Sequence, residues 1–273
     1  MTTTMFKRNW QRWAVAILVF LISAVYQRIT GPTFPLRGKV QVGAETIRYR
    51  LARSHGGTDD HRVTVRVSDP KTQGILSCKR FRTDDLWTDT PMQREGGDLV
   101  GYLPHQPPAG KLLYKIRLQS ENGAVIVPPG GPVDIRFKGA VPVVFLATHI
   151  LFMSLAMIFS NRAGLEALSR FGRSRKLVIW TVVTLVLGGI ILGPIVQKYA
   201  FGNWWTGFPF GHDLTDNKTA LAFLFWLGAL WAGRKGRKAR GWIVAAAIVM
   251  LGVYLIPHSV LGSELDYART RNL

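Results

Sequence analysis

Residues 139–161 read GAVPVVFLATHILFMSLAMIFSN and contain no Asp, Glu, Lys or Arg. An α-helix needs about 20 mostly apolar residues to cross the hydrocarbon core of a bilayer, and this stretch is long enough. Three other stretches also lack these residue types: 13–27, 177–197 and 219–233. A fifth apolar stretch begins at residue 241, and we expect it to leave the membrane near Ile256. We therefore predict a membrane α-helical protein with five transmembrane helices.

Basic residues gather on one predicted side of the membrane. The N-terminal residues and the loops 162–176 and 234–240 are rich in Lys and Arg, whereas the loop 198–217 carries only Lys198. Short loops rich in Lys and Arg remain in the cytoplasm. We predict a bacterial inner-membrane protein with a cytoplasmic N-terminus and a periplasmic C-terminus. The net charge of +19 then reflects topology and contact with anionic membrane lipids, and we expect no nucleic-acid binding.

The long segment between the first two predicted helices has the period of β-structure. Residues 62–67, RVTVRV, alternate polar and apolar side chains, and Gly, Pro, Asn and Asp residues separate several such runs. We predict an all-β sandwich. The predicted domains are an N-terminal transmembrane anchor (1–29), a periplasmic β-sandwich domain (30–138), a four-helix transmembrane bundle (139–257) and a periplasmic C-terminal tail (258–273).

A polar cluster is predicted at the periplasmic end of the bundle. Asp213 is a suitable N-cap for a helix that begins at Leu214, and Asp216 three positions on completes a carboxylate version of the capping box. The C-terminal tail is expected on the same side. One interpretation is a divalent-metal or polar-substrate site, whose ligands would be Asp213, Asp216, His258 and Glu264. The alternative is a set of caps and ion pairs, such as Lys218 with Glu264.

Aromatic residues are concentrated just before this cluster. Trp204, Trp205, Phe208 and Phe210 stand close together in the sequence. An aromatic belt at headgroup depth accounts for two or three of them. We predict an interaction surface for a partner protein here.

His149 lies within the apolar stretch 139–161, near mid-bilayer by helical rise. A histidine at this depth is a candidate axial ligand for haem. The other predicted helices offer no second histidine at the same depth, so a hydrogen bond to a neighbouring helix is the competing interpretation.

Two sets of residues resemble known protein groups. The segments WWTGFPFG (204–211), DLTDNKT (213–219) and PHS…GSELDY (257–267) resemble uncharacterised bacterial polytopic inner-membrane proteins. That resemblance implies the location and no activity. The run GYLP…GKLLYKI (101–116) resembles later strands of immunoglobulin-like or fibronectin-type-III-like domains, which implies a fold without an activity of its own.

Nucleophile–His–acid arrangements, phosphate-binding glycine loops and paired-cysteine motifs are not apparent in the sequence. We therefore predict a non-enzymatic accessory or docking subunit of a larger membrane complex, in contact with lipids and with other membrane or periplasmic subunits. The alternative is a redox protein that binds haem or a metal through His149 or through the cluster of Asp213, Asp216, His258 and Glu264.

Overall fold

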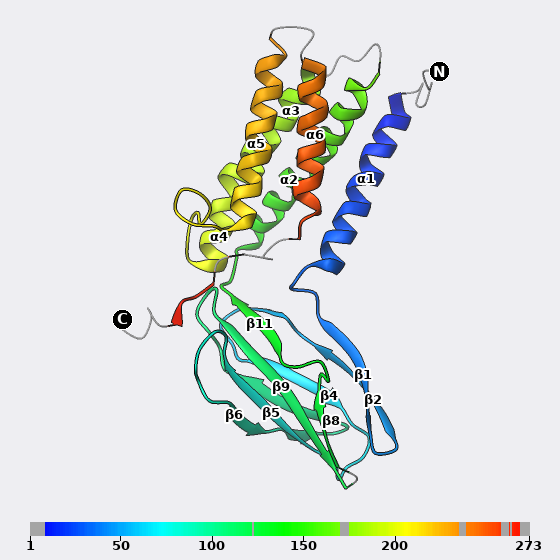
Figure 1. Cartoon of the computed structure of the whole chain (residues 1–273), viewed down its shortest axis with the longest axis vertical. Helices are drawn as coiled ribbons and strands as arrows, with labels where there is room; N and C mark the ends of the chain where they lie inside the picture. The colour runs from blue at the N-terminus through cyan, green and yellow to red at the C-terminus, as the bar shows by residue number, and fades with distance from the viewer. Residues whose placement is uncertain are drawn as a thin grey trace. The chain divides into compact units, whose positions relative to one another are not determined.

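The computed structural model describes residues 9–121, 123–169, 175–234, 239–257, 262 and 264–267. These residues form two compact units. The helical unit comprises the described residues of Met1–Pro32, Val141–Tyr199 and Asn203–Gly262. The β unit comprises those of Thr33–Ala140, Ala200–Gly202 and Ser263–Leu273. Figure 1 shows the elements of each unit in chain order.

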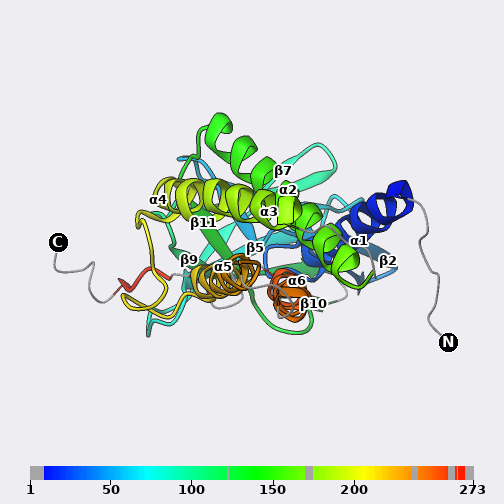
Figure 2. The same ribbon diagram turned by 90° about the horizontal axis from the view of Figure 1, so that it is seen from above.

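The helical elements are α1 (Asn9–Thr30), α2 (Val143–Ala167), α3 (Arg175–Leu185), the π-helical stretch η1 (Val186–Leu192), α4 (Gly193–Phe201), α5 (Leu214–Ala232) and α6 (Ala239–Leu255). Helix α3, η1 and α4 follow one another without a break, so Arg175–Phe201 is one continuous helical run. Figure 2 views these helices from above, where α2 lies beside α3 and α6.

Among the residues that the structure describes, three helical runs are long and apolar enough to cross a membrane: Asn9–Thr30, Val143–Ala167 and Arg175–Phe201. The sequence predicts five such helices, so the described part of the chain confirms membrane helices, but three of them and not five. Helix α6 is apolar but has 17 residues. Helix α5 carries Asp216 and Lys218 in its first two turns, and these charged residues lower its mean hydropathy.

A partly buried ionic cluster joins α1 to α2. The Glu166 carboxylate accepts hydrogen bonds from Arg12 Nη1, at 2.8 Å, and from Arg162 Nη1. Arg162 Nη2 also donates to Asn9 Oδ1 at 2.6 Å. Arg162 is therefore a buried helix residue, 4% exposed, and not the loop cation that the charge pattern predicted. Helix α2 continues past residue 161, and Glu166, one turn further along it, pairs with Arg162.

The strands of the β unit are β1 (Leu36–Val42), β2 (Glu45–Leu51), β3 (Ser54–Gly56), β4 (His61–Arg66), β5 (Gln73–Arg80), β6 (Thr88–Pro91), β7 (Gln93–Glu95), β8 (Asp98–Leu103), β9 (Lys111–Ser120), β10 (Gly123–Val127) and β11 (Val133–Lys138). The largest sheet has the order β3-β11-β9-β5-β6, with β10 also paired to β9. A second sheet has the order β4-β8-β7, and β1 pairs with β2.

One hydrophobic core serves all three sheets. The alternation predicted for 62–67 is confirmed, since Val63, Val65 and Val67 are buried. They belong to the same cluster as Ile47 of β2 and Ile116 of β9. The sheets thus share their apolar faces.

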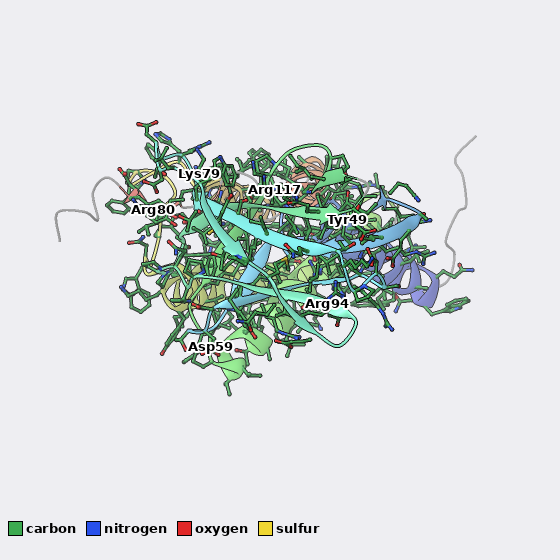
Figure 3. All side chains as sticks on the ribbon, turned by 90° about the horizontal axis from the view of Figure 1, so that it is seen from below. Tyr49, Asp59, Lys79, Arg80, Arg94 and Arg117 are labelled. Atoms are coloured by element: carbon green, nitrogen blue, oxygen red, sulfur yellow. The ribbon has the colours of Figure 1, made fainter. Side chains whose placement is uncertain are left out.

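Arg94, labelled in Figure 3, fixes the turn that precedes β5. Its guanidinium donates to the carbonyl oxygens of Val67 at 3.1 Å, Asp69 at 3.0 Å and Thr72 at 2.6 Å. A planar guanidinium carries five donors, so it can satisfy several carbonyls of one turn.

Candidate functional site

The aromatic loop, residues 203–213, joins α4 to α5 within the helical unit. Phe208 and Phe210 are 79% and 82% exposed, and Trp204 is 58% exposed. Trp205 is half-buried, and its indole Nε1 donates to the Phe208 carbonyl at 3.1 Å. The loop therefore presents three large aromatic side chains to the surroundings of the chain.

The carboxylate of Asp216, in the first turn of α5, fixes this loop through hydrogen bonds. Its Oδ2 accepts the backbone N–H groups of Thr206 at 2.7 Å and Gly207 at 3.0 Å. The same oxygen also accepts from Gln197 Nε2 at 3.1 Å and from the Thr206 hydroxyl at 3.2 Å. Asp216 is only 7% exposed. Hydrogen bonds to a carboxylate are among the strongest in proteins, so the loop is fixed at Thr206 and Gly207.

Asp213 and Asn217 add two more attachments. Asp213 is the N-cap of α5, as predicted, and its Oδ1 accepts the Thr215 N–H at 2.8 Å. Asn217 Oδ1 accepts the Phe208 N–H at 2.7 Å. The predicted capping box is not formed, because the Asp213 N–H donates instead to the Thr206 carbonyl. Asp216 therefore does not accept the Asp213 N–H and accepts the N–H groups of the loop instead.

Gly207 sits where the loop passes closest to α5. A Cβ atom there would lie 2.6 Å from Asp216 Cβ and 2.8 Å from Asn217 Oδ1. Both distances are shorter than van der Waals contact, so a larger residue would push the loop away from its carboxylate. The Gly207 carbonyl accepts the N–H groups of Phe210 and Gly211, at 2.9 and 3.0 Å. The loop is thus closed on itself beside the exposed rings.

The residues proposed as metal ligands have protein partners. Asp213 and Asp216 are occupied as described above. Glu264 belongs to the β unit, where its carboxylate accepts from Lys111 Nζ at 2.5 Å and from Arg82 Nη1 at 2.9 Å. His258 lies outside the described residues. Among the residues that the structure describes, no group of three or more His, Cys, Asp or Glu residues is arranged to hold a metal ion.

The alternative ion pair of Lys218 with Glu264 is replaced by two separate interactions. Lys218 Nζ donates to the Ile256 carbonyl at 2.5 Å, within the helical unit. Glu264 pairs with Lys111 and Arg82. Sequence reasoning missed both cations, since they lie more than 150 residues before Glu264 in the chain.

His149 bonds to the neighbouring helical run. Its Nδ1 lies 2.9 Å from the carbonyl oxygen of Gly188 in η1. Gly193 N–H donates to the same oxygen. A backbone carbonyl of the π-helical stretch thus supplies the interhelical hydrogen bond that the sequence suggested. Within the described parts of α1 to α6, the sequence contains no other histidine, so a second axial haem ligand of that type is not found there.

No protein-family model, curated protein or solved structure matches this chain. Its function is therefore inferred from its own residues.

Proposed function

We propose that this chain is a membrane-embedded docking subunit that holds a partner protein against its aromatic loop. The observation that supports the proposal is the combination of exposed Phe208 and Phe210 with a buried carboxylate, Asp216, that fixes the backbone between them and α4. Aromatic side chains supply much of the energy of protein interfaces. The partner would be another membrane or periplasmic protein.

Rigidity favours a protein partner over lipid as the occupant of the loop. Aromatic side chains that only insert among lipid headgroups do not need a fixed backbone, since lipids adapt to their positions. A protein interface gains affinity when the loop is ordered before binding, because the entropy cost of ordering has already been met. Asp213, Asp216 and Asn217 together provide that order.

The proposed setting is a bacterial inner membrane. The helical runs α1, α2 and Arg175–Phe201 support membrane insertion. We infer that α5 and α6 cross with them, because both bury residues in the same apolar cluster as α2 and α3. The distribution of Lys and Arg supports a cytoplasmic N-terminus. The β unit would then be periplasmic, and its shared core supports an immunoglobulin-like sandwich.

Two labelling measurements separate protein from lipid as the occupant. A photo-crosslinking amino acid replaces Phe208 in the full-length chain, in cells, and the matched control carries it in place of Leu86, which is 89% exposed in the β unit. We expect the Phe208 position to form one discrete adduct of constant mass, identified by mass spectrometry as the same protein in repeated preparations. Adducts with phospholipid alone would contradict the proposal, as would the same protein adduct at Leu86.

A further inference from the structure

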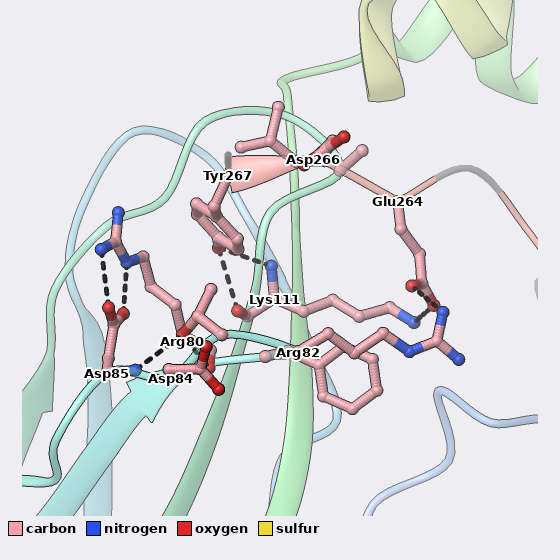
Figure 4. Close-up of a pocket in the computed structure, with 12 residues that line it drawn as sticks. Arg80, Arg82, Asp84, Asp85, Lys111, Glu264, Asp266 and Tyr267 are labelled. Carbon is pink, nitrogen blue, oxygen red and sulfur yellow. Dashed lines mark hydrogen bonds and ion pairs between the residues drawn. The ribbon is translucent and has the colours of Figure 1, made fainter. Parts of the chain in front are cut away.

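The β unit contains a cleft of about 510 Å³ at the end of β5. Arg82, Ala109 and Lys111 line one side of it and the chain's own residues Glu264–Tyr267 line another (Figure 4), so this volume is the space that remains with that segment in place. Sites that bind small ligands or peptide side chains have volumes of this order, roughly 300–1,000 Å³. We refer to Glu264–Tyr267 as the acidic segment.

The acidic segment is recognised by three kinds of contact. The carboxylate of Glu264 bridges Arg82 and Lys111. The backbone N–H of Leu265 donates to the Ala109 carbonyl at 3.1 Å. The Tyr267 hydroxyl accepts the Lys111 N–H and lies within hydrogen-bond distance of the Lys111 carbonyl, at 2.9 Å each. Four consecutive residues are thus bound through a charged side chain, a backbone N–H group and a side-chain hydroxyl, as in a peptide-binding site.

The cations of the cleft are held in place around an aromatic ring. Lys111 Nζ lies 5.0 Å and Arg82 Cζ 5.2 Å from the centre of the Phe81 ring. Arg80, whose guanidinium pairs with Asp85, covers the Tyr267 ring at 5.3 Å. Both cations also pair with the Glu264 carboxylate, which offsets the repulsion between two like charges that share one ring.

The backbone of the cleft is unusual at the two positions that meet the acidic segment. Arg82 has φ of 55° and Ala109 has φ of 69°, and among the described residues these are the non-glycine positions with positive φ. The left-handed region is unfavourable for a residue with a Cβ atom, and such strain is found mostly at binding sites. Arg82 pairs with Glu264, and Ala109 accepts from Leu265.

We propose that Arg82, Ala109 and Lys111, on one side of this cleft, form a recognition site for a Glu-x-x-Tyr segment, and that the chain's own Glu264–Tyr267 covers this site. A partner segment of the same chemistry, with a carboxylate three residues before a tyrosine, takes the cleft when the chain's own segment leaves. The site is distinct from the aromatic loop and does not depend on its function.

Peptide exchange tests the proposal on the full-length chain in detergent. The probe is a fluorescein-labelled peptide, SELDYAR, followed by fluorescence anisotropy. The release variant combines Glu264→Gln with Tyr267→Ala, which removes the side-chain contacts of the segment with Arg82 and Lys111 and should detach it. Because the probe can bind only the fraction of chains whose own segment has left, we expect the release variant to bind the probe at least about tenfold tighter than the natural chain. Arg82→Ala in the release variant should weaken binding by up to about fivefold, as expected for an exposed ion pair, and the peptide SQLDYAR should bind more weakly than SELDYAR.

Hydrogen exchange of the natural chain tests the same proposal without any variant. An exchangeable segment opens without unfolding the β unit, so we expect the Leu265 amide to exchange roughly a hundredfold faster than the Ile116 amide of β9. The free SELDYAR peptide in excess should leave the Ile116 rate unchanged. Equal exchange rates for the two amides would overturn the proposal, as would a folded release variant that binds the probe no better than the natural chain.

Discussion

Asp216 Oδ2 lies 2.7 Å from the backbone nitrogen of Thr206, and so one carboxylate of α5 fixes a loop ten residues earlier in the chain. The sequence predicts that Asp216 caps its own helix, α5, but its carboxylate binds the loop that precedes α5. Phe208 and Phe210 follow directly after the fixed point and are exposed. A buried charge in such a position stabilises the loop only while its donors stay in place.

Replacing Asp216 by Ala should loosen the loop. Two backbone N–H groups would lose their acceptor, and we expect the free energy of unfolding to fall by about 2–4 kcal/mol, since hydrogen bonds to charged groups contribute about 1.5–3 kcal/mol each and are partly replaced by water. Asn217→Ala removes a single bond to Phe208 and should cost less, about 1 kcal/mol. Thermal unfolding in detergent measures both. Equal stability of Asp216→Ala and Asn217→Ala would show that the carboxylate does not hold the loop.

Gly207→Ala tests the close approach of the loop to α5. The added methyl group would meet Asp216 Cβ and Asn217 Oδ1 below contact distance, so we expect a loss of about 1–3 kcal/mol, as is usual for overpacking. Gly97→Ala is the matched control, because nothing lies within 4 Å of its Cβ position. Hydrogen exchange at Phe208 should rise in Gly207→Ala and stay unchanged in Gly97→Ala. Unaltered exchange in both variants would refute the packing described here.

The bond between His149 and Gly188 predicts a structural role for this histidine. His149→Leu should lower the free energy of unfolding by about 0.5–2 kcal/mol, the range of interhelical hydrogen bonds in membranes. The purified natural chain should show no Soret absorption. A Soret band that disappears in His149→Leu would establish the haem alternative in place of this interpretation.

His61 predicts acid sensitivity of the β unit. Burial disfavours its imidazolium and nearby His55 repels it, which lowers the pKa of His61 from 6.5 to about 4. Between pH 6.5 and 4 the unfolded chain therefore binds more protons than the folded chain, and stability falls as the pH drops through that window. Because His61 is partly exposed, we expect a loss on the order of 1 kcal/mol.

The matched variant for this pH effect is His61→Gln, which cannot titrate. Its unfolding free energy, measured by denaturant titration at pH 7 and pH 4.5, should change less than that of the natural chain. Identical changes in both proteins would place the acid sensitivity elsewhere. His55 Nδ1, 3.1 Å from His61 Nδ1, makes His55→Gln a useful second comparison.

Local patterns in the sequence predicted local structure. Alternation in β4 indicated Val63 and Val65 as core residues, and residue type indicated Asp213 as an N-cap, because both depend on neighbours within four positions. Phe208 and Phe210 are exposed, and the interaction surface predicted there stays a prediction. The charge pattern placed Arg162 in a loop, and this prediction is wrong because the partly buried Glu166, one turn later in the same helix, pairs with Arg162.

Contacts between distant segments were not predictable. Glu264 was expected beside Asp213, yet it pairs with Arg82 and Lys111 of the β unit. No spacing rule connects residues so far apart. A glycine is the usual sequence signal for a left-handed backbone position, but here the position is occupied by Arg82, so the sequence does not indicate it. The π-helical stretch that contains Gly188, the hydrogen-bond partner of His149, was also not predictable from the sequence. A π-helical stretch has the same apolar composition as an α-helical one.

Native mass measurement of the detergent-solubilised protein tests the docking function most directly. The natural chain, of 30.5 kDa, should be released from the membrane as a complex with a second, different protein in fixed stoichiometry. Phe208→Ala combined with Phe210→Ala should leave the chain without that protein, whereas Leu86→Ala should keep it. A natural chain that is always found without another protein, or a double variant that retains the complex, would contradict the account.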